Sequence, residues 1–289
     1  MADDSMTRRL PGWIRVIHAF PVATVITATT LLLLVLGGPT LGTLGVLRGV
    51  LTVLMTQIAT GALNDYVDRE RDAVTQPEKP IPSGDVSPGF ALALTTVSLI
   101  LYIPFAVSFG PIAFAVLTLG LIGGLSYDLW LKPTVLSPLP YIVGFLSLGT
   151  WAAIVTDTFQ ARIILIYPIA ALLLVAAHIS QSLPDVESDR RHGQHGIAVA
   201  LGPVRSLAAL AILTTAASVA ALALAAYTRV WIAIGFALTG GCLSALAVAA
   251  GFRAPCERTR RLTVFHLMAP AIALMALGSI IAGRALLAR

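Results

Sequence analysis

Charged residues are scarce in this chain, at 11% of its 289 residues, whereas 57% of the residues are hydrophobic. Because a soluble domain carries about 25% charged residues, this scarcity and a mean hydropathy of +0.88 exclude an ordinary soluble fold. Cysteine is scarce as well. The two cysteines, Cys242 and Cys256, lie at different predicted depths and lack metal-ligand spacing, so neither a disulfide nor a zinc site is expected.

Long apolar runs fill most of the remaining sequence. A helix needs about 20 residues to cross a hydrocarbon core of roughly 30 Å, and runs of that order recur along the chain. They predict an all-α integral membrane bundle of nine transmembrane helices around a central cavity, in a single domain over residues 1–289. The expected spans are residues 16–37, 41–63, 88–108, 111–127, 138–156, 161–183, 205–227, 230–251 and 263–283.

The distribution of basic residues predicts the orientation of this bundle. If the N-terminus is cytoplasmic, most lysines and arginines fall in loops on its side, as the positive-inside rule requires, and nine spans place the C-terminus outside. Met1–Arg15 is expected to be a cytoplasmic lead-in, because the apolar run that follows is too long for a signal-peptide core. Topology accounts for the net charge of +5, so no nucleic-acid partner is expected.

Two bursts of acidic residues interrupt the apolar sequence, one after the second expected span and one after the sixth. Asn64, Asp68 and Asp72 are four residues apart, which places them on one stripe of a helix. Asp185 and Asp189 repeat that spacing, and both bursts are expected on the same membrane face. Like charges at this spacing repel one another, and a bound cation would turn that repulsion into coordination. Oxygen ligands without a nearby His or Cys pair favour Mg²⁺ over zinc.

A third polar segment lies between the two bursts, at the inner end of the fourth expected span. There Tyr127 and Lys132 provide a hydroxyl and an ammonium group that could hold phosphate oxygens. Arg71, Lys79 and Arg190 offer further cationic contacts. Singly, each of these cations is explained as a topological charge. As a group they complement a diphosphate bridged by metal ions.

With these motifs the sequence resembles the UbiA-type intramembrane prenyltransferases along its whole length. Four segments carry the resemblance: the Asn-Asp-x-x-Asp-x-x-x-Asp signature over 64–72, Lys-Pro-Ile-Pro-Ser-Gly over 79–84, a Tyr-to-Lys element over 127–132, and a second Asp-x-x-x-Asp signature over 185–189. The third segment is similar to the family's Tyr-Ser-x-x-Leu-Lys. The sequence departs from the family pattern at Lys79, where many relatives have arginine, and at His18, which stands at an arginine position.

The resemblance implies transfer of a prenyl group from an isoprenoid diphosphate donor to a hydrophobic acceptor, aromatic or lipid-like, through an allylic carbocation. It implies two Mg²⁺ ions held by Asn64, Asp68, Asp72, Asp185 and Asp189, with Tyr127 and Lys132 also catalytic. The donor diphosphate would be bound by Asp65, Arg71, Lys79, Lys132 and Arg190. The lipid bilayer is the other expected partner, in a bacterial-type plasma membrane with the active site facing the cytoplasm.

Three polar residues are candidates for the acceptor side. Gln57 lies seven residues before Asn64 and His178 seven before Asp185, each about two helical turns deeper, and His18 lies near the first span. The plainer role for Gln57 and His178 is an interhelical hydrogen bond, worth about 0.6 kcal/mol.

Two other functions fit parts of the same pattern. An intramembrane terpene cyclase would ionise a prenyl diphosphate without an external acceptor. A membrane transporter is the third reading, although transporters bind substrates near the bilayer midplane, whereas these acids lie at one membrane edge.

Overall fold

A computed structural model describes residues 10–287, and within that range the secondary structure is helical with no strand. The expected all-α fold is therefore confirmed for this part of the chain. Of the expected lead-in, residues 1–9 lie outside the described range, and the rest forms the short helix α2 (Gly12–Arg15).

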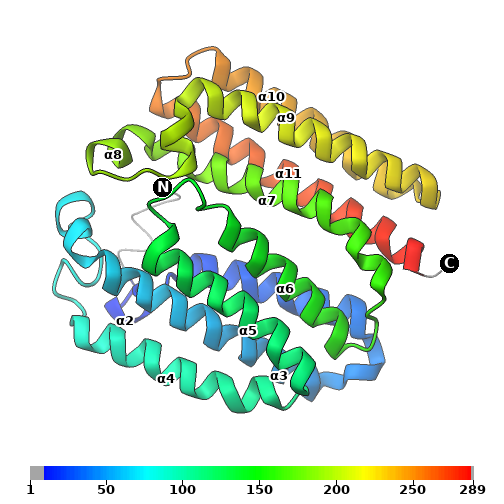
Figure 1. Ribbon diagram of the computed structural model, residues 1–289, viewed down its shortest axis with the longest axis horizontal. Helices are drawn as coiled ribbons and strands as arrows, with labels where there is room; N and C mark the ends of the chain where they lie inside the picture. The colour runs from blue at the N-terminus through cyan, green and yellow to red at the C-terminus, as the bar shows by residue number, and fades with distance from the viewer. Residues whose placement is uncertain (1–9, 288–289) are drawn as a thin grey trace. The chain divides into compact units, whose positions relative to one another are not determined.

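The helices fall into two compact units (Figure 1). The first comprises Met1–Trp130 and Val143–Phe159, and the second comprises Leu131–Ile142 and Gln160–Arg289. After α2, the elements of the first unit are α3 (Ala19–Thr75), α4 (Pro88–Val107), α5 (Pro111–Ser126), most of the π-helical turn η1 (Tyr127–Leu131) and most of α6 (Leu139–Val155). Those of the second are η2 (Ala161–Ile166), α7 (Tyr167–Ser182), η3 (Leu183–Asp185), α8 (Val186–Arg191), α9 (Ile197–Thr228), α10 (Trp231–Phe252) and α11 (Arg258–Leu287).

Within the first unit, α3 contains two apolar helices, Pro21–Gly37 and Leu41–Thr75. The chain turns between them, and Gly42 has a φ of 64°, which glycine adopts without a steric penalty. The two helices pack closely: a Cβ on Gly49 would come within 2.8 Å of a Leu33 methyl carbon. Leu33 belongs to a buried apolar cluster with Trp151 of α6.

The second unit packs α7, α9, α10 and α11 against one another. Small residues permit this packing, because a Cβ on Gly240 would lie 2.6 Å from the carbonyl oxygen of Ala271 and one on Gly251 would lie 2.6 Å from Leu207. Close approach at small residues is typical of membrane helices. The core cluster of this unit includes Leu207 and Met268.

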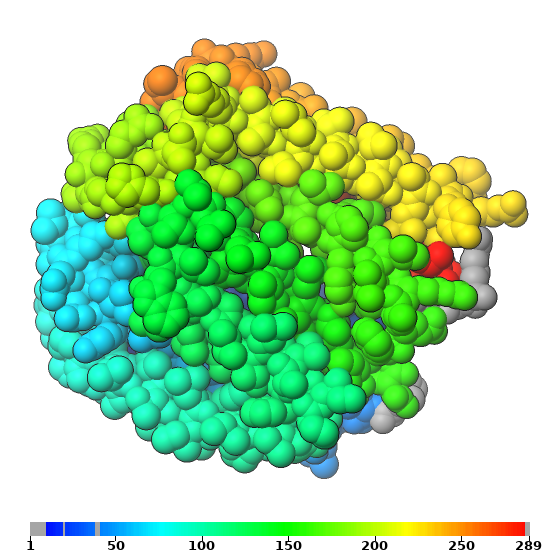
Figure 2. All heavy atoms as spheres, in the orientation of Figure 1, coloured from blue at the N-terminus to red at the C-terminus, as the bar shows by residue number. Residues whose placement is uncertain are grey.

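Seven described helices are long and apolar enough to cross a membrane: Leu41–Thr75, Pro88–Val107, Pro111–Leu131, Ala161–Arg191, Ile197–Thr228, Trp231–Phe252 and Arg258–Leu286. Two further apolar helices, Pro21–Gly37 and Leu139–Val155, are shorter. Both α4 and α9 lie at the surface (Figure 2), where side chains such as Ile100 and Ile212 are exposed. The protein is therefore an integral membrane protein. The total of nine spans and the cytoplasmic N-terminus stay predictions.

Candidate active site

The first acidic motif lies on an uninterrupted helix. The expected span 41–63 continues as one helix to Thr75, so Asn64, Asp68 and Asp72 share a stripe, as their spacing predicts. The chain buries this stripe: Asp68 is 7% exposed and Asp72 is fully buried. Buried carboxylates need partners, and this motif obtains them from nearby cations.

Arg71 and Lys79 neutralise the buried acids. The Arg71 guanidinium lies 2.6 Å from Asp68 Oδ2 and 3.3 Å from Asp72 Oδ1. Lys79 Nζ lies 2.7 Å from Asp72 Oδ2 and 3.1 Å from Asp65 Oδ1. The structure thus brings five predicted site residues of this segment into one network of ion pairs.

Lys79 reaches this network from the loop that follows α3. Burial by itself would lower the pKa of Lys79, but the carboxylates of Asp65 and Asp72 outweigh that effect and hold the pKa above its ordinary value. The ammonium group therefore stays charged at neutral pH. Arg15 anchors the loop, because its guanidinium lies 2.9 Å from Asp85 Oδ2 and also donates to the carbonyl oxygen of Glu78.

His18 joins the same network. Its Nε2 lies 3.0 Å from Asp65 Oδ1, the oxygen that Lys79 also contacts. The other carboxylate oxygen, Asp65 Oδ2, is buried and has no hydrogen-bond partner among the described residues. His18, one of the three candidates for the acceptor side, therefore lies beside the first acidic motif.

Sequence reasoning assigned no role to Asp128, which the structure places at the first motif. Asp128 is buried in η1, and its Oδ1 accepts a 2.8 Å hydrogen bond from Asn64 Nδ2. Its neighbour Tyr127 is the first residue of η1, and Lys132 follows the last. One feature of the sequence could have pointed to Asp128. It is an acidic residue at the second position of the 127–132 element, where the family's Tyr-Ser-x-x-Leu-Lys pattern has serine.

The second acidic motif has a different backbone. Pro184 follows the end of α7, and the chain passes through η3 into the short helix α8, so Asp185 and Asp189 do not share one regular helix. The Asp185 side chain is 54% exposed, and Arg258 of α11 lies 3.0 Å from its Oδ1. The neighbouring Glu187 accepts from the buried Arg261, also on α11, at 2.6 Å. By the positive-inside rule, both arginines are expected only as charges in a cytoplasmic loop.

Two other candidates of the second unit, Arg190 and His178, make contacts outside this motif. Arg190 donates to the carbonyl oxygen of Val199 at 3.2 Å. His178 is buried, with Nε2 2.8 Å from Ser137 Oγ and its ring 4.6 Å from that of Tyr141. Ser137 lies in the loop before α6 and Tyr141 lies on α6, so the hydrogen bond runs from α7 to a loop and only the ring contact is interhelical.

Gln57 lies on α3 in the first unit, and its amide nitrogen is 3.5 Å from the hydroxyl oxygen of its neighbour Thr56. Among the described residues, its side chain makes no hydrogen bond or ion pair with the acidic network. The structure thus gives Gln57 a local contact, and its proposed role in binding an acceptor stays a prediction.

The donor set at the first motif fits Mg²⁺. Within residues 10–287, no three Asp, Glu, His or Cys side chains form a ready-made cage for a metal ion. Mg²⁺ does not require one, because it keeps several waters and binds one or two carboxylates together with substrate phosphates. The first motif offers several hard oxygen donors: the carboxylates of Asp68 and Asp72, the amide oxygen of Asn64, and Asp65 Oδ2, which has no hydrogen-bond partner among the described residues.

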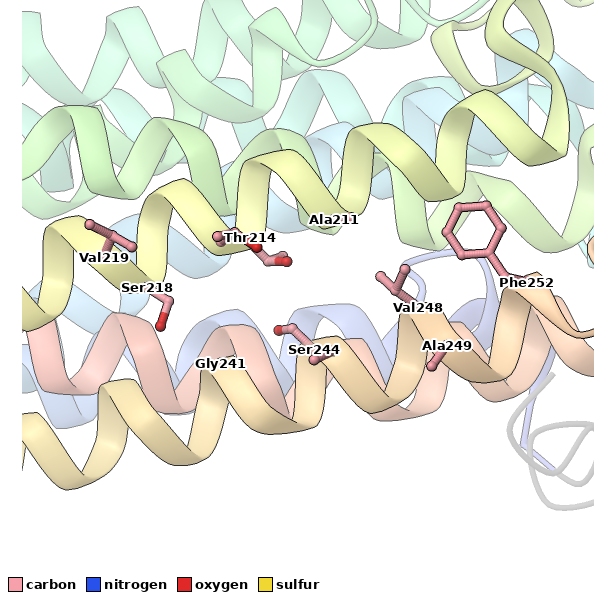
Figure 3. A pocket seen from close by; sticks show the side chains of 11 residues that line it. Ala211, Thr214, Ser218, Val219, Gly241, Ser244, Val248, Ala249 and Phe252 are labelled. Atoms are coloured by element: carbon pink, nitrogen blue, oxygen red, sulfur yellow. The ribbon is translucent and has the colours of Figure 1, made fainter.

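A groove of about 470 Å³ lies elsewhere, between α9 and α10 of the second unit (Figure 3). Its lining includes Thr214, Ser218 and Ser244, with Phe252 toward one end. The predicted site residues are not part of this lining.

The sequence pattern of the UbiA prenyltransferase family matches residues 22–269, and the chain belongs to that family. It is 31% identical to the digeranylgeranylglyceryl phosphate synthase of Natronomonas pharaonis, over 54% of this chain and 57% of that protein. It is 30% identical to the synthase of the same name from Ignicoccus hospitalis, over 78% and 77% of the two chains. It is 28% identical to the bacteriochlorophyll synthase 33 kDa chain of Cereibacter sphaeroides, over 55% and 53%. The chain thus spans less than two thirds of the first of these relatives.

Solved structures show the same fold. A structure of digeranylgeranylglyceryl phosphate synthase in membranes is similar with a TM-score of 0.73 and 16% identity, over 94% of this chain and 97% of that one. A UbiA homologue from Archaeoglobus fulgidus bound to GPP and Mg²⁺ is similar with a TM-score of 0.67 and 18% identity, over 94% and 99%.

Proposed function

We propose that this protein transfers a prenyl group from an isoprenoid diphosphate to an aromatic or lipid-like acceptor within the membrane, with Mg²⁺ as cofactor. The observation that carries the proposal is the buried network of Asp65, Asp68, Asp72, Arg71 and Lys79 in a member of the UbiA prenyltransferase family. The GPP and Mg²⁺ bound by the Archaeoglobus homologue support the donor class and the metal. The proposal keeps both an aromatic and a lipid-like acceptor, because the related proteins are named as synthases of different products, digeranylgeranylglyceryl phosphate and bacteriochlorophyll.

The metal ligands in this proposal are Asn64, Asp68, Asp72, Asp185 and Asp189, for two Mg²⁺ ions. Bound Mg²⁺ supplies a Lewis acid that offsets the charge of the leaving diphosphate. The proposed functional domain is the whole chain, 1–289.

The cations of the chain bind the diphosphate in this scheme. Lys79 and Arg71 are already charged and oriented by their carboxylate partners, so they donate to phosphate oxygens with little reorganisation. Lys132, Tyr127 and Arg190 contribute further donors. The apolar helices exclude water, which protects the allylic cation until the acceptor attacks it.

The acceptor side and the orientation complete the proposal. His18, beside Asp65, and the deeper residues Gln57 and His178 contact or orient the acceptor. The site faces the cytoplasm of a bacterial-type plasma membrane, with nine spans, the N-terminus inside and the C-terminus outside.

Product analysis tests the reaction. Purified protein is incubated with Mg²⁺ and a panel of prenyl diphosphates, with and without a native lipid extract, and released diphosphate and product masses are measured. We expect diphosphate release that EDTA abolishes, and a product that equals the acceptor plus a prenyl group. A hydrocarbon or terpene alcohol formed without extract would identify a cyclase, and uptake into proteoliposomes without diphosphate release would identify a transporter. Either result would overturn the proposal.

A further inference from the structure

Asp128 is a buried acid without a part in the proposed reaction. It is 7% exposed in η1, directly after α5, and accepts the 2.8 Å hydrogen bond from Asn64 Nδ2. Four residues earlier on each helix, Gly124 of α5 faces Thr60 of α3, where a Cβ would come within 3.0 Å of the threonine methyl carbon. The missing Cβ therefore lets the two helices approach at this level, which brings Asp128 within reach of Asn64.

This hydrogen bond determines which way the Asn64 amide faces. The NH₂ group of Asn64 points toward Asp128, because Nδ2 is the donor and the carboxylate oxygen of Asp128 is the acceptor in this bond. The carbonyl oxygen is on the same planar carbon and is therefore directed away from Asp128. A flipped amide would place two acceptor oxygens against each other. Because the carbonyl oxygen is the atom of asparagine that ligates hard cations, Asp128 selects the orientation in which Asn64 presents its ligand atom.

We propose that Asp128 is a positioning residue for the Mg²⁺ site: it holds Asn64 with its carbonyl oxygen available to the metal. This inference rests on the proposed function, since it assumes that Asn64 is a ligand. Where the resembling family pattern has a neutral serine, this chain has a carboxylate. Removing a group that holds a metal ligand typically weakens metal binding by 10–100-fold.

Binding of Mn²⁺, used as a paramagnetic probe in place of Mg²⁺, tests this role without turnover. Protein in nanodiscs, without prenyl diphosphate, is titrated and free Mn²⁺ is followed by electron paramagnetic resonance. We expect Asp128→Ala to weaken binding by about tenfold or more, and Asp128→Asn, which keeps an acceptor oxygen opposite Asn64, to weaken it less. Asp157→Asn is the matched control, because it removes an acid from an exposed position after α6, and it should bind as the wild type does.

A double variant separates positioning from a purely structural role. If Asp128 acts through Asn64, Asp128→Ala adds little further weakening in an Asn64→Ala background. Fully additive losses would overturn the positioning role. If Asn64→Ala binds Mn²⁺ weakly while both Asp128→Asn and Asp128→Ser bind it as the wild type does, the positioning role is also overturned. These two variants decide the question if Asp128→Ala does not fold. Wild-type Mn²⁺ binding by both Asn64→Ala and Asp72→Ala would instead overturn the metal site, so the two failures are distinguishable.

Discussion

The two acidic motifs have similar spacing but different surroundings. In the first unit, the carboxylates of Asp68 and Asp72 are buried and pair with Arg71 and Lys79, from the same segment of chain. In the second unit, Asp185 is about half exposed and pairs with an arginine 73 residues away on α11. The first motif is thus a network built on buried carboxylates, whereas Asp185 of the second belongs to a half-exposed ion pair.

The backbone explains this difference. The helix of the first motif runs unbroken to Thr75 and carries its acids inward on one face. In the second motif, Pro184 lacks the N–H that a regular helix would use, and the chain changes from α7 to η3 to α8. Similar spacing therefore gives similar geometry only where the helix continues.

We expect the largest effect on diphosphate release. If alanine variants of both motifs lose it, both motifs serve one reaction despite their different surroundings. Asp68→Ala, Asp72→Ala and Asp185→Ala should each lower diphosphate release by at least about 100-fold, because metal ions supply several kcal/mol of transition-state stabilisation. The measurement is diphosphate release by purified, membrane-inserted variants, with Asp157→Asn as the control. Near-normal turnover in all three would remove the site assignment.

The free energy of unfolding should fall more when an acid of the first motif is removed than when Asp185 of the second motif is removed. Asp72 is fully buried and Lys79 is 17% exposed, and Asp72→Ala leaves Lys79 without one of its two carboxylates, so we expect a loss of about 3–5 kcal/mol in the free energy of unfolding. Asp185→Ala removes only a half-exposed pair and should cost less than about 1 kcal/mol. Denaturant unfolding in detergent measures both. Adding Lys79→Met to Asp72→Ala should restore part of the stability, and equal losses in the two single variants would contradict the contrast in burial.

Alkaline pH should weaken the first motif in a defined window. The folded-state pKa of Lys79 is raised above its ordinary value of 10.5, so the charged lysine stabilises the fold fully below pH 10.5. That stability is lost as the pH rises through the higher folded-state pKa. Unfolding measured between pH 8 and pH 11.5 should show a decline near the top of this range that Lys79→Met lacks. A decline already complete by pH 9 would contradict this assignment.

A further contrast in burial concerns two arginines of α11. Arg261 is 3% exposed and binds Glu187 through two guanidinium nitrogens, so Arg261→Ala should cost about 1.5–3 kcal/mol. Arg258→Ala removes a half-exposed partner of Asp185 and should change the unfolding free energy by less than about 1 kcal/mol. Thermal unfolding of both variants side by side tests this order, and the reverse order would show that burial does not govern this end of α11.

Much of the architecture could be predicted from the sequence because the relevant signals are local. Apolar runs located the helices to within a few residues in most cases, as with the expected span 88–108 and the observed Pro88–Val107. The prediction ended the second span at residue 63, where charge begins, whereas the helix continues to Thr75 because its acids are neutralised by Arg71 and Lys79. Hydrophobicity marks where a membrane span ends, but not where a helix ends.

The candidate site was only partly predictable. The spacing of Asn64, Asp68 and Asp72 placed them on one face, since periodicity is a property of the chain itself. Asp128 was missed because its contact with Asn64 crosses 64 residues, and Arg258 was missed because its contact with Asp185 crosses 73. No local pattern encodes such pairings.

The sequence by itself determined that this protein is a helical membrane protein of the UbiA prenyltransferase family, since composition and motif spacing can be read residue by residue. Only the tertiary structure decided which acids are buried, which cation neutralises each of them, and that Asp128 orients Asn64. Those outcomes depend on which helix faces pack together. At Gly124, for example, an added Cβ would lie only 3.0 Å from the Thr60 methyl carbon, so a side chain there would push α5 and α3 apart.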